Sequence, residues 1–236
     1  AQIANIDSMC YPAVVRFMNQ TPLFSANATF LWTFPDNSTS TLSNPGNMAI
    51  TTPGNYTVSL IVSDSCGVDT VIQNFRILDY PKASFSAGKA CEGNPTSFSN
   101  SSSINANDGN IVSYKWLFGD GNSSSTKNPS YVYKADGNYA VTLIATSNNG
   151  CVDTLQKQIT VFDQPSIQIS QNGTSYCPKV PINFNALVNL KGALVDSINW
   201  DFGDGNESSD STIIQHSYSK SGTYRVLFWV GTNQGC

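Results

Sequence analysis

Apolar and polar residues alternate along three stretches of the chain, each of which begins at the tyrosine of a Gly-x-Tyr triplet. In 56–62, Tyr, Val, Leu and Val stand at every second position, and the same period recurs over 139–143 and 224–230. This period of two predicts β-strands with one face in a core. Two further strands, over 70–78 and 154–162, complete hairpins, and the 3.6-residue period of a helix is almost absent. The pattern indicates an all-β sandwich protein.

The landmarks of this pattern occur three times. Trp32, Trp116 and Trp200 are 84 residues apart, and the sequence after the second, WLFGDG, is nearly the same as that after the third, WDFGDG. The first copy has diverged to WTFPDN. An internal period of this kind identifies one module repeated in tandem. We predict three domains, over 1–79, 80–164 and 165–236.

Each landmark has a structural role in such a fold. The three tryptophans are expected to fill the space between the sheets of their sandwiches. The tyrosines of the Gly-x-Tyr triplets are expected to form tyrosine corners, with each hydroxyl bonded to nearby backbone. The Gly-Asp-Gly segments lead into no predicted helix, so we interpret them as tight turns and not as phosphate loops. The three tyrosines are Tyr56, Tyr139 and Tyr224.

Composition narrows the functional classes. Only 12% of residues are charged, and the formal net charge is −4. Nucleic-acid binding depends on basic patches, and an anionic membrane surface attracts the same patches, so both partners are disfavoured. A run of about 18 apolar residues, as a spanning helix needs, is not found. No signal peptide opens the chain, so we expect Ala1 to begin a processed or excised piece.

The residues around the second and third tryptophans carry a family resemblance. The runs 113–121, 128–133 and 137–143 strongly resemble a PKD (polycystic kidney disease) domain, and 200–205 with 216–224 match it again. The resemblance implies three tandem Ig-like, PKD-type sandwiches arranged as a rod. The segment Gly-Cys-Val-Asp-Thr at 150–154 is similar to cysteine-bearing PKD copies in large Bacteroidota surface proteins. Many of those are exported by the type IX system and act in gliding or adhesion, which implies an extracellular location.

Two cysteines belong to each repeat, which fits disulfides and an oxidising compartment better than zinc. We favour pairing within each repeat, which would close three loops of similar size. In an Ig-like sandwich, however, the two cysteines of a repeat can lie at opposite ends. The alternative therefore joins neighbouring repeats through Cys10–Cys151 and Cys91–Cys236. The cysteines are Cys10, Cys66, Cys91, Cys151, Cys177 and Cys236.

Candidate sites for chemistry are few. Calcium needs six to eight oxygen ligands, and the EF-hand spacing is absent. The weak calcium candidates are Asp108 in an Asn-rich loop and the linker aspartates Asp79 and Asp163; an ordinary polar loop is the default, and no other cofactor is expected. The lone histidine, His216, is expected to be a hydrogen-bonded packing residue, and no catalytic constellation is present.

Surface features complete the predictions. Trp229 occupies a position that is apolar in all three copies, and we expect it to be buried under a loop or a neighbouring domain; an exposed aromatic for glycan stacking is the alternative. Segments of the form Asp-Ser/Thr followed by an apolar residue or Thr resemble an O-glycosylation motif of Bacteroidota. The candidates are Ser8, Thr70, Thr154, Ser197 and Ser211.

The expected function follows from this architecture. Short proline-bearing joints at 78–81 and 162–165 favour a semi-rigid rod. The third repeat stops at Cys236, before the last strand of its neighbours, which predicts an open sheet edge. We expect a non-enzymatic spacer or adhesion stalk of a larger surface protein, with an accessory module of a secreted hydrolase as the alternative. Its partners would be other domains of the same polypeptide, surface glycans, or further copies assembled into a filament through a donated strand.

Overall fold

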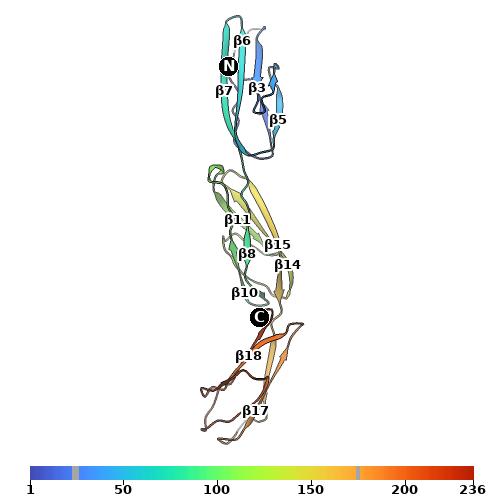
Figure 1. Cartoon of the computed structure of the whole chain (residues 1–236), viewed down its shortest axis with the longest axis vertical. Coiled ribbons are helices and arrows are strands. Elements are labelled where there is room, and N and C mark those ends of the chain that lie inside the picture. The colour runs from blue at the N-terminus through green and yellow to red at the C-terminus, as the bar shows by residue number, and fades with distance from the viewer. Residues whose placement is uncertain (23–26, 174–175) are drawn as a thin grey trace.

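The computed structural model describes residues 1–22, 27–173 and 176–236. Three β-sandwiches follow one another along a single long axis, as Figure 1 shows, and the predicted all-β rod is confirmed. Each sandwich has two sheets. Within the described residues, no helix is long and apolar enough to cross a membrane.

Domain 1 contains strands β1 to β7. Its larger sheet has the order β1-β7-β6-β3-β4, and β2 pairs with β5 in the other. The short β1 runs parallel to the end of β7. The strands are β1 (Met9–Cys10), β2 (Ala13–Phe17), β3 (Thr29–Thr33), β4 (Thr39–Ser40), β5 (Gly46–Ile50), β6 (Gly54–Asp64) and β7 (Gly67–Leu78).

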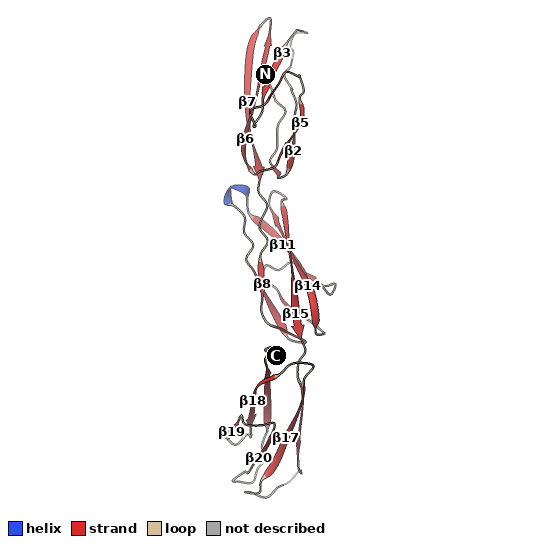
Figure 2. Ribbon diagram, turned by 45° about the vertical axis from the view of Figure 1, so that its right-hand side comes forward, coloured by secondary structure: helices blue, strands red, loops and turns tan. Residues whose placement is uncertain are grey.

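Domain 2 repeats this plan with a larger second sheet. Its sheets have the orders β12-β11-β14-β15-β9 and β13-β10-β8, and β9 runs parallel to the end of β15. One 3-10 turn, η1 (Ala106–Asp108), precedes β11, and it is the blue element in Figure 2. The strands are β8 (Phe85–Ala87), β9 (Ala90–Cys91), β10 (Pro95–Asn100), β11 (Ile111–Leu117), β12 (Ser123–Ser124), β13 (Ser130–Val132), β14 (Gly137–Ser147) and β15 (Val152–Phe162).

Domain 3 has two three-stranded sheets, β16-β17-β20 and β19-β18-β21. Strand β21 corresponds to β14, but among the described residues no strand pairs with it where β15 pairs with β14. It begins only at Leu227, although its Gly-x-Tyr triplet starts at Gly222. The strands are β16 (Ser166–Gln171), β17 (Ile182–Asn189), β18 (Val195–Asp201), β19 (Glu207–Ser208), β20 (Ile213–His216) and β21 (Leu227–Thr232).

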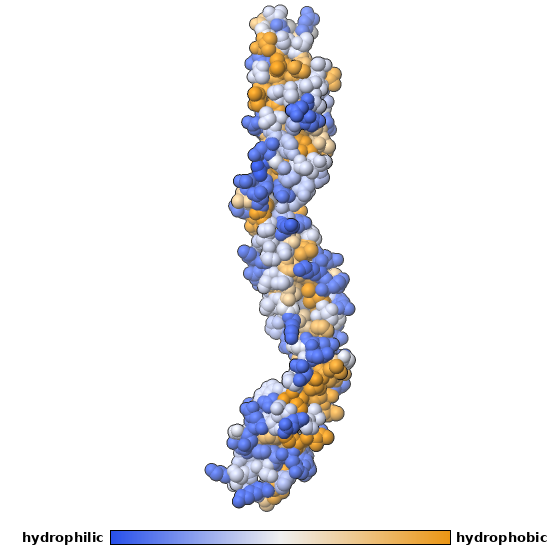
Figure 3. Space-filling view, in the orientation of Figure 1, coloured by the Kyte–Doolittle hydropathy of each residue, from blue (hydrophilic) through white to orange (hydrophobic). Residues whose placement is uncertain are grey.

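The open edge of domain 3 exposes part of its core. In domain 2, Phe85 of β8 is 2% exposed; in domain 3, the corresponding Ile169 of β16 is 44% exposed. Figure 3 shows apolar side chains gathered along this third of the rod. In domain 2, Lys157 of β15 lies against Phe85, and no described strand takes the place of β15 in domain 3.

The three tryptophans are fully buried between their sheets, as predicted. Trp116 Nε1 donates to the Thr126 carbonyl at 3.0 Å, and Trp200 Nε1 donates to that of Ser211 at 2.8 Å. Trp32 Nε1 has no hydrogen-bond partner among the described residues. The divergent first copy therefore keeps the packing of this side chain without its hydrogen bond.

The tyrosine corners are confirmed in every repeat. Each Gly-x-Tyr hydroxyl donates to the backbone carbonyl four residues earlier. The distances are 2.8 Å for Tyr56 to Thr52, 2.9 Å for Tyr139 to Ala135 and 3.0 Å for Tyr224 to Lys220. This bond fixes the loop that crosses from one sheet to the other.

The Gly-Asp-Gly segments are tight turns, as predicted. Gly121 and Gly205 have φ of 93° and 90°, and Asn37 replaces them in the first copy with φ of 65°. Asparagine tolerates this left-handed region better than most residues, which explains how the diverged copy keeps its turn. The turn aspartates accept backbone N–H bonds two residues on, as Asp120 does from Asn122 at 3.0 Å.

Candidate functional site: the two interdomain junctions

Two disulfides cross the boundaries between domains. Cys10 of domain 1 bonds to Cys151 of domain 2, and Cys91 of domain 2 bonds to Cys236 of domain 3, each with a Cα–Cα distance of 5.7 Å. The favoured pairing within repeats is wrong, and the alternative across the junctions is confirmed.

The length of the hairpin strands explains this correction. Cys10 pairs with Leu78 at the end of β7, whereas Cys66 lies just before Gly67, where β7 begins. Twelve residues of strand separate the two positions. At about 3.3 Å per residue this is roughly 40 Å, far beyond the reach of a disulfide of about 7 Å between Cα atoms.

The two disulfides form an overlapping pair. One closes the loop 10–151 and the other closes 91–236, so the segment 91–151 belongs to both loops. Most of domain 2 lies inside the shared segment, with β8 and β15 outside it. Consequently, each pair of neighbouring domains is joined by a disulfide in addition to the backbone linker.

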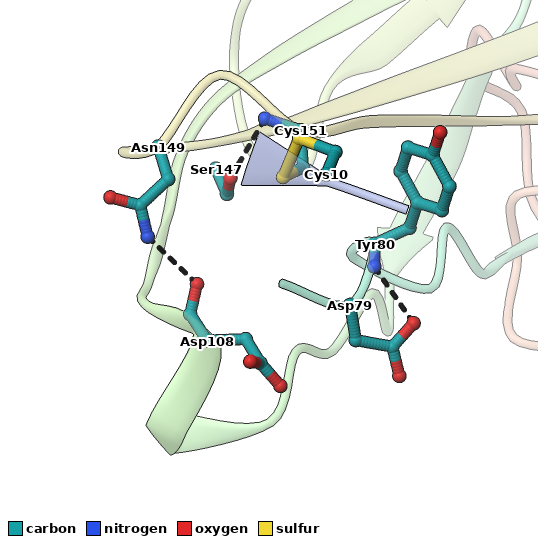
Figure 4. The surroundings of a disulfide bond; sticks show 7 residues. All are labelled: Cys10, Asp79, Tyr80, Asp108, Ser147, Asn149 and Cys151. Carbon is teal, nitrogen blue, oxygen red and sulfur yellow. Dashed lines mark hydrogen bonds between the residues drawn. A yellow bond between two sulfur atoms is a disulfide. The ribbon is translucent and has the colours of Figure 1, made fainter. Parts of the chain in front are cut away.

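The first junction is packed tightly around its disulfide. Cys151 is 1% exposed, and its backbone N–H donates to Ser147 Oγ at 3.1 Å, as Figure 4 shows. The rings of Tyr11 and Tyr80 contact each other across the boundary, with centroids 5.1 Å apart. Cys151 is therefore buried at the junction, and Cys10 is half-buried.

An ion pair accompanies the first disulfide. Arg76 of β7 donates through Nε and Nη2 to Asp108 Oδ1 of η1, at 3.0 and 2.7 Å. The Asp108 side chain is only 3% exposed, and Arg76 also donates to Asn55 at 2.7 Å. Asn149 Nδ2 donates to the Asp108 carbonyl at 2.9 Å. The Asn-rich loop is thus an interdomain contact.

The second junction also has an ion pair, but here the following domain supplies the cation and the preceding domain supplies the carboxylate. Lys191, in the loop before β18 of domain 3, lies 3.2 Å from Asp163 and 4.0 Å from Asp136. Its side chain is 64% exposed. Hydrogen bonding and attraction to Asp163 raise the pKa of Lys191.

Three carboxylates meet at this second junction. One oxygen from each of Glu92, Asp136 and Asp163 lies within 4.8 Å of the others. A hydrogen bond with the Asp163 carboxyl is the main cause that raises the pKa of Glu92, and the nearby Lys191 ammonium opposes the rise. Like charges at this spacing favour a shared proton or a nearby cation.

The three calcium candidates all lie at the junctions, and the structure gives each a protein partner. Asp108 meets Arg76, Asp163 meets Lys191, and Asp79 Oδ1 accepts the Tyr80 N–H at 2.8 Å. Calcium binding at these residues stays a prediction. Two of the three carboxylates are paired with a cationic side chain of the protein.

His216 is a packing residue, as predicted. Its Nε2 lies 2.8 Å from Asp204 Oδ2, and its ring stacks on Phe202 at 4.1 Å. In domain 2 the same place is taken by Tyr131, whose hydroxyl donates to Asp120 at 2.5 Å. Burial acts to raise the pKa of Asp204, but the hydrogen bonds from His216 and Asn206 lower it overall. A tyrosine at the equivalent position argues for a structural pair.

Trp229 is 49% exposed, so the expectation of burial is wrong. Its counterpart Ile144 is flanked by Thr154 of β15, and no described strand takes that place beside β21. The exposed-aromatic alternative stays open. All five O-glycosylation candidates are exposed, so modification of those residues is sterically possible and stays a prediction.

The ion pairs at the junctions were not predicted from the sequence. Arg76 and Lys191 carry no local motif, and each lies near the end of an element that only the junction places against its partner. The sequence offers one hint: both are charged residues in a chain where only 12% of residues are charged.

Comparison with known proteins places these domains in a family. The family model of the PKD domain matches residues 6–78, 79–161 and 163–236. Collagenase ColA of Bacillus cereus is 37% identical over 87 residues, which cover 37% of this chain and 8% of that protein. The metalloprotease PrtV of Vibrio cholerae is 48% identical over 59 residues, which cover 25% of this chain and 6% of that protein.

A solved structure of one such domain is also similar in sequence to part of the chain. The crystal structure of the PKD1 domain of PrtV from Vibrio cholerae is 41% identical, and the match covers 35% of this chain and 96% of that one, with a TM-score of 0.32. The chain spans less than a tenth of the length of the curated relatives that it matches. Since the family model matches three times in tandem over nearly all residues, the chain belongs to the PKD-domain family.

Proposed function

We propose that the chain is a non-enzymatic, extracellular spacer, a stalk segment that holds the other parts of a larger bacterial surface protein at a distance. The observation that carries the proposal is the pair of disulfides that join the three domains end to end. A spacer works only when its length is fixed, and domains joined only by short linkers bend at the boundaries. A covalent bond beside each linker gives every boundary a second point of attachment.

The chemistry of the chain supports this proposal. The most catalytic-looking pair, His216 with Asp204, is matched in domain 2 by Tyr131 with Asp120, so the repeats keep the hydrogen bond to the turn aspartate and not the histidine. Interdomain disulfides persist only in an oxidising compartment, which favours an extracellular location.

A second candidate is an accessory module of a secreted hydrolase. The collagenase and the metalloprotease that are similar to the PKD domains of this chain favour this candidate. The exposed Trp229 would be its contact to a polysaccharide. In that case, retention on insoluble polysaccharide or collagen exceeds the retention of a Trp229→Ala variant.

Small-angle X-ray scattering in solution tests the spacer directly. The oxidised chain is expected to scatter as one extended rod whose distance distribution matches Figure 1. A matched variant with serine at Cys10, Cys151, Cys91 and Cys236 is expected to give a broader distribution, because each boundary then has one attachment. Equal, broad distributions for the two proteins would contradict the proposal.

A further inference from the structure

Strand β15 crosses domain 2 from one junction to the other. It begins directly after Cys151, which is bonded to domain 1, and it ends at Phe162, next to the linker to domain 3. Figure 2 shows this strand running along the domain. A β-strand rises about 3.3 Å per residue and a fully stretched chain spans at most about 3.6 Å per residue, so β15 can lengthen by only about a tenth.

The beginning of domain 2 crosses the same domain beside β15. From the linker the chain passes through β8 and β9 to Cys91, which is bonded to domain 3. Strand β9 is parallel to the end of β15, where the Glu92 N–H donates to the Phe162 carbonyl at 2.8 Å. Further along, Lys157 of β15 donates to the Phe85 carbonyl of β8 at 2.5 Å. The two crossing segments therefore lie side by side.

Domain 1 is crossed by two neighbouring segments in the same way. Ala1 pairs with Asp69 near the start of β7, and Cys10 pairs with Leu78 at the end of that strand. The segment 1–10 thus runs beside β7 for most of its length. One of the two segments reaches the first junction at the disulfide, and the other reaches it at the linker.

The disulfides join these segments into two continuous covalent routes along the rod. The first route runs from 1–10 across the Cys10–Cys151 bond into β15 and on to β16 of domain 3. The second runs from β7 through the linker to Cys91 and across its bond to Cys236. Both routes leave out β3, β11 and β18, the strands that hold the three buried tryptophans.

We propose that the chain carries tension along these two routes, so that a pulling force passes from domain to domain without unfolding the cores. A domain that lies directly in the path of a force lengthens when it unfolds. Here each route is covalent and already extended, so backbone and disulfides hold the force before the core strands move. A rod that bends would carry tension equally well, so scattering that contradicts the spacer function leaves this proposal intact.

Single-molecule stretching between two internal points tests the first route. Handles are attached through p-azidophenylalanine at the exposed positions Asn5 and Gln171, in a background without the two unpaired cysteines. Along the first route about 25 residues separate the handles, so the oxidised chain should stop at about 90 Å without an unfolding step. In the variant Cys10→Ser/Cys151→Ser about 150 residues separate them, and the chain should lengthen in steps to about 500 Å.

A second pair of handles is the matched control. Val68 and Gln234 are also about 25 residues apart, but along the second route. For this pair, Cys91→Ser/Cys236→Ser should release the chain to about 500 Å, and loss of the first disulfide should leave the limit of about 90 Å unchanged. Unfolding steps in the oxidised chain, or release of both pairs by the loss of either disulfide, would overturn the proposal.

Discussion

The two junctions of the rod share their covalent bond and differ in almost everything around it. Both disulfides join the start of one domain to the turn that follows the Gly-x-Tyr strand of the next, with the same Cα–Cα distance. The ion pair beside the first has a carboxylate that is 3% exposed; the one beside the second has an ammonium that is 64% exposed. The disulfide is therefore the common feature, and the polar contacts are particular to each boundary.

The sign of the charges is also reversed. At the first junction, the loop before β11 places Asp108 against Arg76. At the second junction, the loop before β18 places Lys191 against Asp163. If domains 2 and 3 exchanged places, Lys191 would face Arg76 of domain 1. Like-charge contacts of this kind exclude wrong neighbours, so the charges favour one order of domains.

The largest expected effect is the loss of either disulfide. Replacing Cys10 and Cys151 together by serine should lower the free energy of unfolding by about 5 kcal/mol, because a loop of 141 residues is no longer closed in the unfolded chain. The Cys91 and Cys236 pair should lose the same amount, measured by urea unfolding. The control replaces Cys66 and Cys177, which have no partner here. Different losses for the two bonded pairs would contradict the equivalence of the junctions.

The buried ion pair comes next. Arg76→Met leaves the Asp108 carboxylate without its cation and should destabilise the first junction by about 3 kcal/mol. Hydrogen exchange of the backbone around η1 measures this, with faster exchange expected there and unchanged exchange in domain 3. The double variant Arg76→Met/Asp108→Leu should recover most of the loss. No recovery would show that Arg76 acts by packing alone.

The exposed ion pair should matter much less. Lys191→Met is expected to leave the free energy of unfolding nearly unchanged, because solvent screens an exposed pair. The difference should vanish in 1 M salt, where the Debye length is about 3 Å, whereas the Arg76 effect should persist. Equal losses for Lys191→Met and Arg76→Met would remove the distinction between the junctions.

The smallest effect is a pH dependence confined to the second junction. Because hydrogen bonding to Asp163 raises the pKa of Glu92, the folded chain holds a proton that the unfolded chain has released. The contribution to stability is full below the unfolded pKa of about 4.3 and is lost as pH rises through the higher folded pKa. Carboxyl NMR titration should show the raised midpoint, and Asp163→Asn, which removes the acidic partner, should lower it. A midpoint that Asp163→Asn leaves unchanged would contradict the shared proton.

The sequence was sufficient for the features that depend on local periodicity. The spacing of Trp116 and Trp200 predicted the cores, and Gly-x-Tyr predicted bonds such as that from Tyr139 to Ala135. The favoured disulfide pairing within repeats was wrong, because the pairing depends on which end of a strand each cysteine occupies. Trp229 was placed wrongly because its burial depends on a neighbouring strand and not on its own alternation.

A rod of fixed length requires that the disulfides across the junctions form in the folded chain. Single-molecule stretching tests it on a variant that keeps only Cys10 and Cys151, with serine at the other four cysteines. If those two are bonded, full unfolding extends about 95 residues, or about 320 Å at 3.3–3.6 Å per residue, and reductant raises this to about 800 Å. An extension of about 800 Å without reductant would show that the junction bond does not form.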